Sequence, residues 1–301
     1  ALPAKVASLK DVTAIACGEV ATAAVTASGR LYTWGSGRGG RLGHGNDATH
    51  AKPRPVDGLH TPTPTPVDVP PSHFVSAGSL VAAAITTEGQ LYMWGCGLSG
   101  ALGQGDRVNH PTPVLVDGFG GVPVTHVACT AGQIASPAGQ PPGGEAPHTL
   151  AVTADGSAWS WGTCHKGMLA NHTHKILSPP DGDELTPYRI GSPTQDEPKA
   201  GPSGYLAGET CVAATSAAIH STVLTASGRL FSFGCGSDGR TGTMKYLTGL
   251  AGHTSRMKCY ISAPTEIHLP AGRVRAVDSA RRHMVAIVDE GAAAAGAGGE
   301  A

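Results

Sequence analysis

Leu31–Asn46 reads LYTWGSGRGGRLGHGN, and similar stretches occur three more times along the chain. The copies are Leu91–Asp106 (LYMWGCGLSGALGQGD), Ala158–Asn171 (AWSWGTCHKGMLAN) and Leu230–Thr243 (LFSFGCGSDGRTGT). Their equivalent aromatic residues, each directly before a glycine and 60, 67 and 72 residues apart, are Trp34, Trp94, Trp161 and Phe233. Internal repetition on this scale predicts an array of similar structural units.

Each unit also contains a hairpin signal upstream of its aromatic residue. A short apolar run ends in threonine. After this run comes a glycine, which lies five residues before the aromatic residue. These glycines are Gly29, Gly89, Gly156 and Gly228. Two β-rich runs separated by Ser-Gly, Glu-Gly or Asp-Gly predict a β-hairpin, because glycine supplies the positive φ that tight turns require.

A proline followed by an apolar residue recurs downstream and predicts one more strand per unit. The segments are Pro55-Val56, Pro113-Val114, Pro187 to Ile190 and Pro264 to Ile267. Each unit therefore has about four short strands and no amphipathic helix. This pattern predicts an all-β fold in which every unit is one blade of a β-propeller.

Two of the units carry a family resemblance. His148-Thr-Leu-Ala-Val-Thr-Ala-Asp-Gly156 followed by Trp161-Gly162, and Trp94-Gly-x-Gly-x-x-Gly-x-Leu-Gly-x-Gly-Asp106, resemble the repeat of the regulator of chromosome condensation family. The pattern extends from about residue 12 to residue 288. The resemblance implies four-stranded blades, and the family usually has seven of them in a closed ring.

The chain departs from the family pattern at two places. The histidine that precedes the apolar run stands at His148, His220 and His283, but the first two repeats have Ala21 and Val81 there. We expect these histidines to make structural hydrogen bonds at strand starts. The Leu-Gly-x-Gly ending is lost in repeats three and four, which read Leu169-Ala170 and Thr241-Gly242.

We expect one propeller domain over residues 1–291 and a disordered tail over 292–301. The repeats cover about 12–59, 74–119, 124–190 and 210–269, with a partial unit at 273–291. Three segments rich in proline and glycine, 61–71, 133–147 and 175–208, are predicted to be loops outside the blades because their compositions cannot build a core.

Closure of the ring is an open question at the level of sequence. Residues 3–9 resemble the last strand of a repeat, whereas 273–291 supply the first two strands of a fifth blade. Residues 3–9 could join that blade and close a small ring. We instead expect further sequence or another chain to complete the propeller, because the chain begins in mid-repeat without Met.

Composition limits the choice of function. The formal net charge is −1 and only 14% of the residues are charged, so no global field attracts nucleic acid or membrane. Seven cysteines without framework spacing favour a reducing intracellular compartment, such as cytoplasm, including cilium or cytoskeleton, nucleus or an organelle matrix. No run approaches the length of a transmembrane helix.

Several motifs suggest chemistry but have simpler explanations. Gly35-x-Gly37-x-x-Gly40 fits a dinucleotide fingerprint, but proline-rich sequence follows it where a helix is needed. Cys164, His165, His172 and His174 match no closed zinc site. Asp278, Ser279 and His283 contain the residue types of a hydrolase triad without a nucleophile elbow. We therefore predict no enzyme activity, no cofactor and no metal.

The sequence predicts a non-catalytic interaction scaffold, docked in a larger assembly. Its expected partners are proteins, bound through rim loops and the insertions 61–71, 133–147 and 175–208. One alternative, implied by the family resemblance, is a guanine-nucleotide exchange factor for a small GTPase. A second alternative is binding to chromatin or nucleic acid, against which the balanced charge argues.

Overall fold

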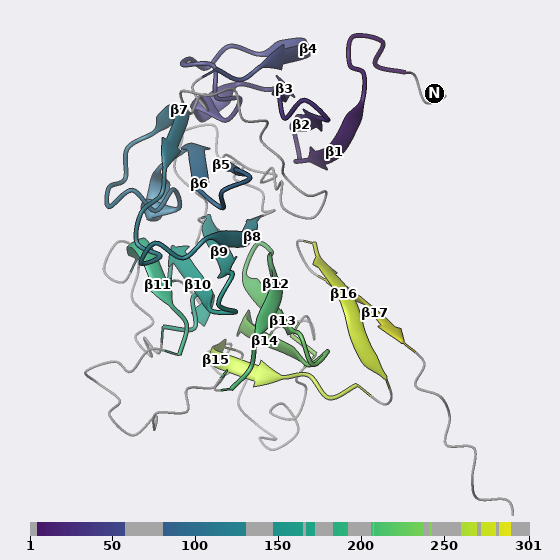
Figure 1. Cartoon of the computed structure of the whole chain (residues 1–301). Helices are drawn as coiled ribbons and strands as arrows, with labels where there is room; N and C mark the ends of the chain where they lie inside the picture. The colour runs from purple at the N-terminus through teal and green to yellow at the C-terminus, as the bar shows by residue number, and fades with distance from the viewer. Residues whose placement is uncertain are drawn as a thin grey trace, which may run out of the picture.

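The protein is described by a computed structural model. The structure describes residues 5–57, 81–130, 147–164, 167–171, 183–191, 206, 208–236, 241–242, 260–269, 272–280 and 283–289. Within these ranges the chain is all-β, and every strand belongs to one of five antiparallel sheets (Figure 1).

Three of the sheets have four strands each, and their strand order follows the chain. Blade 1 consists of β1 (Val12–Cys17), β2 (Ala21–Thr26), β3 (Leu31–Gly35) and β4 (His50–Pro55). Blade 3 consists of β8 (Val124–Cys129), β9 (His148–Thr153), β10 (Ala158–Gly162) and β11 (Glu184–Arg189). Blade 4 consists of β12 (Cys211–Ser216), β13 (His220–Thr225), β14 (Leu230–Cys235) and β15 (Tyr260–Glu266).

The other two sheets are smaller in the described part of the chain. Blade 2 consists of β5 (Val81–Ile85), β6 (Leu91–Gly95) and β7 (His110–Leu115). Blade 5 consists of β16 (Arg273–Ser279) and β17 (Met284–Asp289). Short 3₁₀ turns, η1 (Arg38–Gly40) and η2 (Leu98–Gly100), follow the third strands of blades 1 and 2. A three-residue turn cannot provide the helix that a dinucleotide site requires, so the glycines are turn residues.

The blades follow one another around an open arc (Figure 1). The first strands β1, β8 and β12 lie on its inner side, and the fourth strands β4, β7, β11 and β15 on its outer side. Blades 1 and 5 face each other across the opening. The apolar clusters lie between neighbouring sheets, so each blade has its core at its contacts with the next blade.

The prediction that residues 175–208 form a loop outside the blades is wrong in part. Residues 184–189 of this segment form β11, the fourth strand of blade 3, where Trp159 pairs with Arg189 and Ser160 with Tyr188. Position 187 carries the recurrent proline of the fourth strands, so this stretch has a β-strand pattern inside a polar, proline-rich region. Pro147 also differs from the predicted loop 133–147, because it is buried and its carbonyl oxygen accepts a hydrogen bond from the Thr163 amide.

The expected strand at residues 3–9 is also wrong for the residues that are described. Residues 5–9 form no strand and contain a turn in which the Leu9 amide donates to the Val6 carbonyl. They lie beside β1, across the opening from β17, so they have no strand edge of blade 5 to pair with (Figure 1).

Other expectations fall outside the described residues. These include the loop 61–71, the first strand of repeat two and the tail 292–301. Across the described ranges, no helix has the length and hydrophobicity needed to cross a membrane.

Candidate interaction surface

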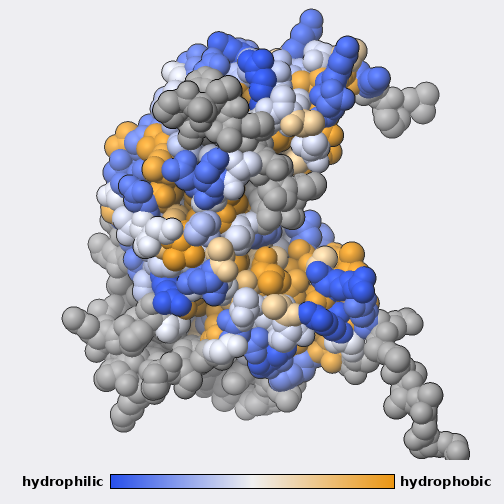
Figure 2. Space-filling model, viewed as in Figure 1, coloured by the Kyte–Doolittle hydropathy of each residue, from blue (hydrophilic) through white to orange (hydrophobic). Residues whose placement is uncertain are grey.

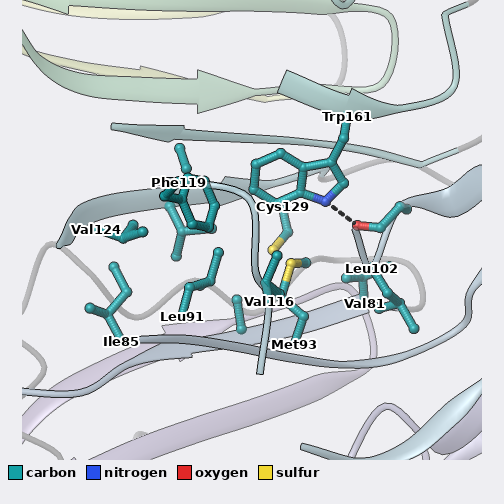
Figure 3. Close-up of a cluster of buried hydrophobic side chains, with 14 residues drawn as sticks. Val81, Ile85, Leu91, Met93, Leu102, Val116, Phe119, Val124, Cys129 and Trp161 are labelled. Atoms are coloured by element: carbon teal, nitrogen blue, oxygen red, sulfur yellow. Dashed lines mark hydrogen bonds between the residues drawn. The ribbon is translucent and has the colours of Figure 1, made fainter. Parts of the chain in front are cut away.

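The three buried aromatic residues fix the contacts between blades. Trp94, Trp161 and Phe233 are completely buried, and each packs against the blade before its own. Figure 3 shows Trp161 lying over the side chains of blade 2, with its indole Nε1 donating to the Ala101 carbonyl at 2.9 Å. Trp94 donates in the same way to the Arg41 carbonyl at 3.0 Å.

Trp34 differs from its three equivalents because it is only half-buried. It lies on β3 of blade 1, the blade at one end of the arc (Figure 1). The sequence assigns Trp34 to the correct repeat position. The burial of its side chain depends on whether another blade packs against it, and the local sequence pattern does not specify that.

The four repeat glycines lie at the hairpin turns, with φ between 72° and 84°. Three of them also contact the next blade. The carbonyls of Gly89, Gly156 and Gly228 accept hydrogen bonds from Val124, Cys211 and Val274, at 2.8, 2.9 and 3.1 Å. A Cβ at Gly156 would lie 2.6 Å from Thr210. Glycine is therefore needed both for the turn and for close approach of the next blade.

The three repeat histidines have different environments along the arc. His148 and His220 are completely buried, whereas His283 is exposed. His148 lies between blades 3 and 4, and its blade-4 neighbours supply hydroxyl groups. His283 holds the same position on blade 5, at the open end of the arc, where the described structure has no blade packed over it.

A buried hydroxyl network surrounds His148. Its Nδ1 lies 2.8 Å from Thr130 Oγ1, and its Nε2 lies 2.7 Å from Ser221 Oγ and 3.0 Å from Ser216 Oγ. Burial, and secondarily the nearby His220, lower the pKa of His148 to about 3. The imidazole is therefore neutral at physiological pH and acts as a structural hydrogen-bonding group.

This network contains a Ser–His contact but lacks the geometry of a hydrolase. Ser221 is fully buried and its hydroxyl donates to the Met168 carbonyl at 3.0 Å, so it is held as a structural donor. The residues with the composition of a triad, Asp278, Ser279 and His283, are also separated. Ser279 Oγ lies 2.6 Å from Thr215 Oγ1, whereas His283 faces solvent.

The basic clusters seen in the sequence are largely engaged in local contacts. Arg41 is buried, and its Nε donates to the Arg38 carbonyl at 2.8 Å. Burial, followed by the charge of Arg38, lowers the pKa of Arg41. Arg273 donates to the Ala226 carbonyl, and Arg275 Nε pairs with Asp289 Oδ2 at 2.6 Å. These side chains do not form a continuous basic surface.

No metal centre emerges from the part of the chain that is described. There, no group of three or more His, Cys, Asp or Glu side chains is placed to hold an ion. His165, His172 and His174 lie outside the described residues, and Cys164 is buried. None of the six cysteines that the structure describes forms a disulfide: Cys17, Cys96, Cys129, Cys164, Cys211 and Cys235.

Exposed apolar side chains gather at the two ends of the arc. On blade 5, Val285 and Ile287 are 60% and 62% exposed. On blade 1, Ile15 is 64% exposed. Figure 2 shows apolar residues on both sides of the opening, over β1 and around β12 and β16. Exposed apolar patches of this kind are typical of interaction sites.

Comparison with known families identifies the repeat. The family description "Regulator of chromosome condensation (RCC1) repeat" matches residues 28–84 and 88–134, and a second model with the same description matches 12–41. These matches lie in blades 1 and 2 and the beginning of blade 3.

Curated relatives match over somewhat more than half of the chain. It is 34% identical over 175 residues to the human E3 ubiquitin-protein ligase HERC2, covering 56% of this chain and 3% of that protein. It is 36% identical over 161 residues to the mitochondrial RCC1 domain-containing protein RUG3 of Arabidopsis thaliana, covering 53% and 32%. It is 31% identical over 183 residues to the Arabidopsis thaliana ultraviolet-B receptor UVR8, covering 60% and 35%. The chain thus spans about a third of two relatives and a small part of HERC2.

Solved structures extend the similarity to almost the whole fold. Human WBSCR16 superposes with a TM-score of 0.63 at 18% identity, covering 93% of this chain and 58% of that one. Yeast RCC1 (Prp20), solved with Kap60, gives a TM-score of 0.50 at 18% identity, covering 92% and 68%. At these identities the similarity supports the fold alone.

Proposed function

Because the chain belongs to the family of RCC1-repeat β-propellers, we propose that it is a non-catalytic protein-interaction scaffold. Binding is assigned to the outer surface of blades 1 to 3. The observation that carries this proposal is that the repeat-defined residues are used in packing, whereas the side chains of the outer strands differ from blade to blade.

The outer strand of blade 1 carries positive charge. His44 and His50 stack edge to face with ring centres 5.1 Å apart, and Arg54 Nη1 lies 3.4 Å from His50 Nε2. Burial, followed by the charge of Arg54, lowers the pKa of His44. Lys52 and Arg54 are exposed.

The equivalent positions of blades 2 and 3 have different charges. In blade 2, Asp106 pairs with His110, with an Oδ2–Nε2 distance of 3.2 Å. In blade 3, the Asn171 side-chain amide donates to Glu184 Oε1 at 3.0 Å. The outer strands thus carry different charged groups: Lys52 and Arg54 on β4, a histidine–aspartate pair at β7, and both Glu184 and Arg189 on β11. Charge patterns of this kind select protein partners by complementarity.

Charge reversal tests the scaffold role. A tagged chain with Lys52→Glu and Arg54→Glu is compared with the native chain and with Arg30→Glu, an exposed charge at a hairpin turn. Isolation from cells followed by quantitative mass spectrometry measures the bound proteins. We expect a near-stoichiometric partner with the native chain and with Arg30→Glu, and its loss from the double variant. Equal recovery by all three would contradict the proposed surface.

Guanine-nucleotide exchange is the second candidate. One solved relative, Prp20p of Saccharomyces cerevisiae, binds Gsp1p and histones. Within the described residues every strand belongs to a blade, so no extra hairpin is available there to open a nucleotide site. A panel of small GTPases loaded with fluorescent GDP separates the two functions, because a scaffold leaves nucleotide release unchanged. A salt-dependent DNA or nucleosome shift tests the chromatin alternative.

A further inference from the structure

Arg41 is a buried charged residue at the contact between blades 1 and 2. It lies directly after η1, and only 7% of its surface is exposed. Its main-chain carbonyl accepts the indole hydrogen of Trp94 from blade 2. The turn before it is also tightly packed, because a Cβ added at Gly40 would lie 2.5 Å from the Cα of Pro111. The packing of two blades therefore fixes the backbone of Arg41.

The guanidinium of Arg41 uses only part of its hydrogen-bonding capacity. Its Nε donates to the Arg38 carbonyl at 2.8 Å, and no acceptor of the described residues pairs with its two Nη amino groups. A fully enclosed Nη group would be a buried donor without a partner, and Arg41 has none of that kind in the described structure. The Nη groups therefore reach solvent, with the forked geometry that binds two oxygens of a carboxylate or phosphate.

The charges around Arg41 favour a bound anion. Burial lowers the pKa of Arg41 most, and the positive charge of Arg38 lowers it further. Glu19 and Asp47 raise this pKa, but both are exposed, and among the described residues neither forms an ion pair with Arg41. Burial raises the pKa of the nearby Cys96 thiol, which therefore stays uncharged. A buried cation without an acidic partner is costly, and an incoming oxyanion reduces that cost.

Blade packing does not require a charge at this position. The equivalent residue is Ala101 in blade 2 and Met168 in blade 3, and both are completely buried. Blade 4 has Arg240 there, which lies outside the described residues. The main-chain carbonyls of Ala101 and Met168 accept hydrogen bonds as that of Arg41 does, so the backbone contact is independent of the side chain.

We propose that Arg41 is the anchor of an oxyanion site, which binds a carboxylate or phosphate group on a side chain of a partner protein. The two Nη groups of Arg41 donate to two oxygens of this group, and Arg38 provides a second positive charge. Arginine in a packed, largely desolvated position is typical of residues that dominate the binding energy of protein interfaces. A guanidinium already held at Nε also loses little conformational freedom on binding. The source of the oxyanion rests on the proposed scaffold role, whereas the site itself does not.

Side-chain NMR of the full chain tests this site. The Nε–Hε signal of Arg41, identified by its loss in Arg41→Met, is followed at constant ionic strength while ligand is added. The ligands are N-acetyl-phosphoserine amide, N-acetyl-glutamic acid amide, inorganic phosphate and chloride. We expect a saturable shift with at least one of the two amino-acid derivatives, with a Kd of about 1 mM, and no shift with chloride. The derivative that binds more tightly identifies the group as phosphate or carboxylate.

Arg41→Met is the decisive variant, because methionine occupies the equivalent position of blade 3. Replacing a buried charge by an apolar side chain of similar volume is often neutral or stabilising, so the melting temperature should be unchanged or higher. The backbone amide shifts of Gly39 and Gly40 should show at least about ten-fold weaker binding. Arg30→Met, which removes an exposed charge at a hairpin turn, is the control and should bind as the native chain does.

Three results would overturn the proposal. A saturable shift with neither derivative excludes a side-chain oxyanion, including the case in which only inorganic phosphate binds. Unchanged binding by Arg41→Met places the site elsewhere, and a clearly lower melting temperature of this variant assigns Arg41 a structural role. Saturable binding that is lost in Arg41→Met, together with equal partner recovery in the charge-reversal test, would reject the proposed scaffold surface and keep the oxyanion site.

Discussion

Blades 2 and 3, and blades 3 and 4, are joined by equivalent contacts that use different residues. In each contact an aromatic residue of one blade is buried against the blade before it. In the first, Trp161 lies against Gly103 and donates its indole hydrogen to the Ala101 carbonyl. In the second, Phe233 packs in a cluster that contains Ala170 in place of the glycine. The equivalent carbonyl, Met168, accepts from the Ser221 hydroxyl at 3.0 Å.

The difference shows that the aromatic residue and the residue beneath it change together. A Cβ at Gly103 would be too close to Trp161 and to Val116, at 2.9 and 3.1 Å. Ala170 has such a Cβ and still adopts a φ of 52°. The smaller ring of Phe233 makes room for it. The Met168 carbonyl keeps the hydroxyl donor Ser221, which corresponds to Thr149 in the first contact, while phenylalanine has no indole donor to offer.

The two contacts also differ at the repeat position that starts the second strand of each blade. Val81 of blade 2 occupies the repeat position that His148 occupies in blade 3. At this position the first contact is therefore apolar. The second contact has a neutral histidine that is hydrogen-bonded to Thr130, Ser216 and Ser221. This makes the second contact sensitive to acid.

Trp161→Ala should have the largest effect on stability. Removing a fully buried tryptophan leaves a cavity and takes away a donor to Ala101, which retains the Thr149 hydroxyl at 2.9 Å. We expect a loss of about 3–5 kcal/mol in the free energy of unfolding, measured by urea denaturation. Trp34→Ala is the matched control, and its half-buried ring predicts a clearly smaller loss. Equal losses would contradict the account.

Phe233→Trp should break the contact between blades 3 and 4. The larger ring meets the Cβ of Ala170, and overpacking of this kind costs about 1–3 kcal/mol. The reverse change, Trp161→Phe, leaves space over Gly103 and produces no clash. A Phe233→Trp variant as stable as the native chain in urea would exclude tight packing at this position.

Acid should weaken the second contact selectively. The pKa of His148 is about 3 in the folded chain, below its unfolded value of about 6.5. Its stabilising contribution is complete above pH 6.5 and decreases as pH falls from 6.5 towards 3, by about 1.4 kcal/mol per pH unit. Between pH 6.5 and 5 the loss is about 2 kcal/mol. Unfolding curves of His148→Gln, which does not titrate, should show a smaller pH slope; an unchanged slope would contradict this role.

Ala170→Gly should have the smallest effect, and a stabilising one. Alanine in the left-handed region costs about 1 kcal/mol, which glycine avoids. Loss of the buried methyl group offsets part of the gain, so the melting temperature should rise slightly. Gly103→Ala is the opposite test, because its new methyl group meets Trp161, and it should lower the melting temperature.

Much of the blade architecture could be predicted from the sequence. The hairpin glycines, the aromatic third strands and the proline-containing fourth strands repeat, and each pattern is local to one blade. The segment 175–208 was harder to interpret, because β11 is a six-residue strand in a long polar region. The recurrent proline at position 187 marks its second half as strand, and its pairing with β10 fixes its full length.

The environment of each repeat residue could not be predicted in the same way. Trp34 and Trp161, or His148 and His283, occupy equivalent positions but differ in burial because a neighbouring blade packs over one and not the other. The hydrogen bonds from Gly89, Gly156 and Gly228 to the next blade likewise depend on spatial contact. Two changes in the sequence signal the altered packing: Ala170 in place of glycine, visible as a lost motif, and Phe233 in place of tryptophan.

A double-mutant cycle on Phe233→Trp and Ala170→Gly tests the central claim most directly. If ring size and the facing residue are matched, the double variant should recover most of the stability that Phe233→Trp loses, with a coupling energy of about 1–2 kcal/mol in urea unfolding. Glycine at position 170 would then accept a tryptophan as Gly103 does. Strict additivity of the two single effects would contradict the claim that the contact between blades is one matched unit.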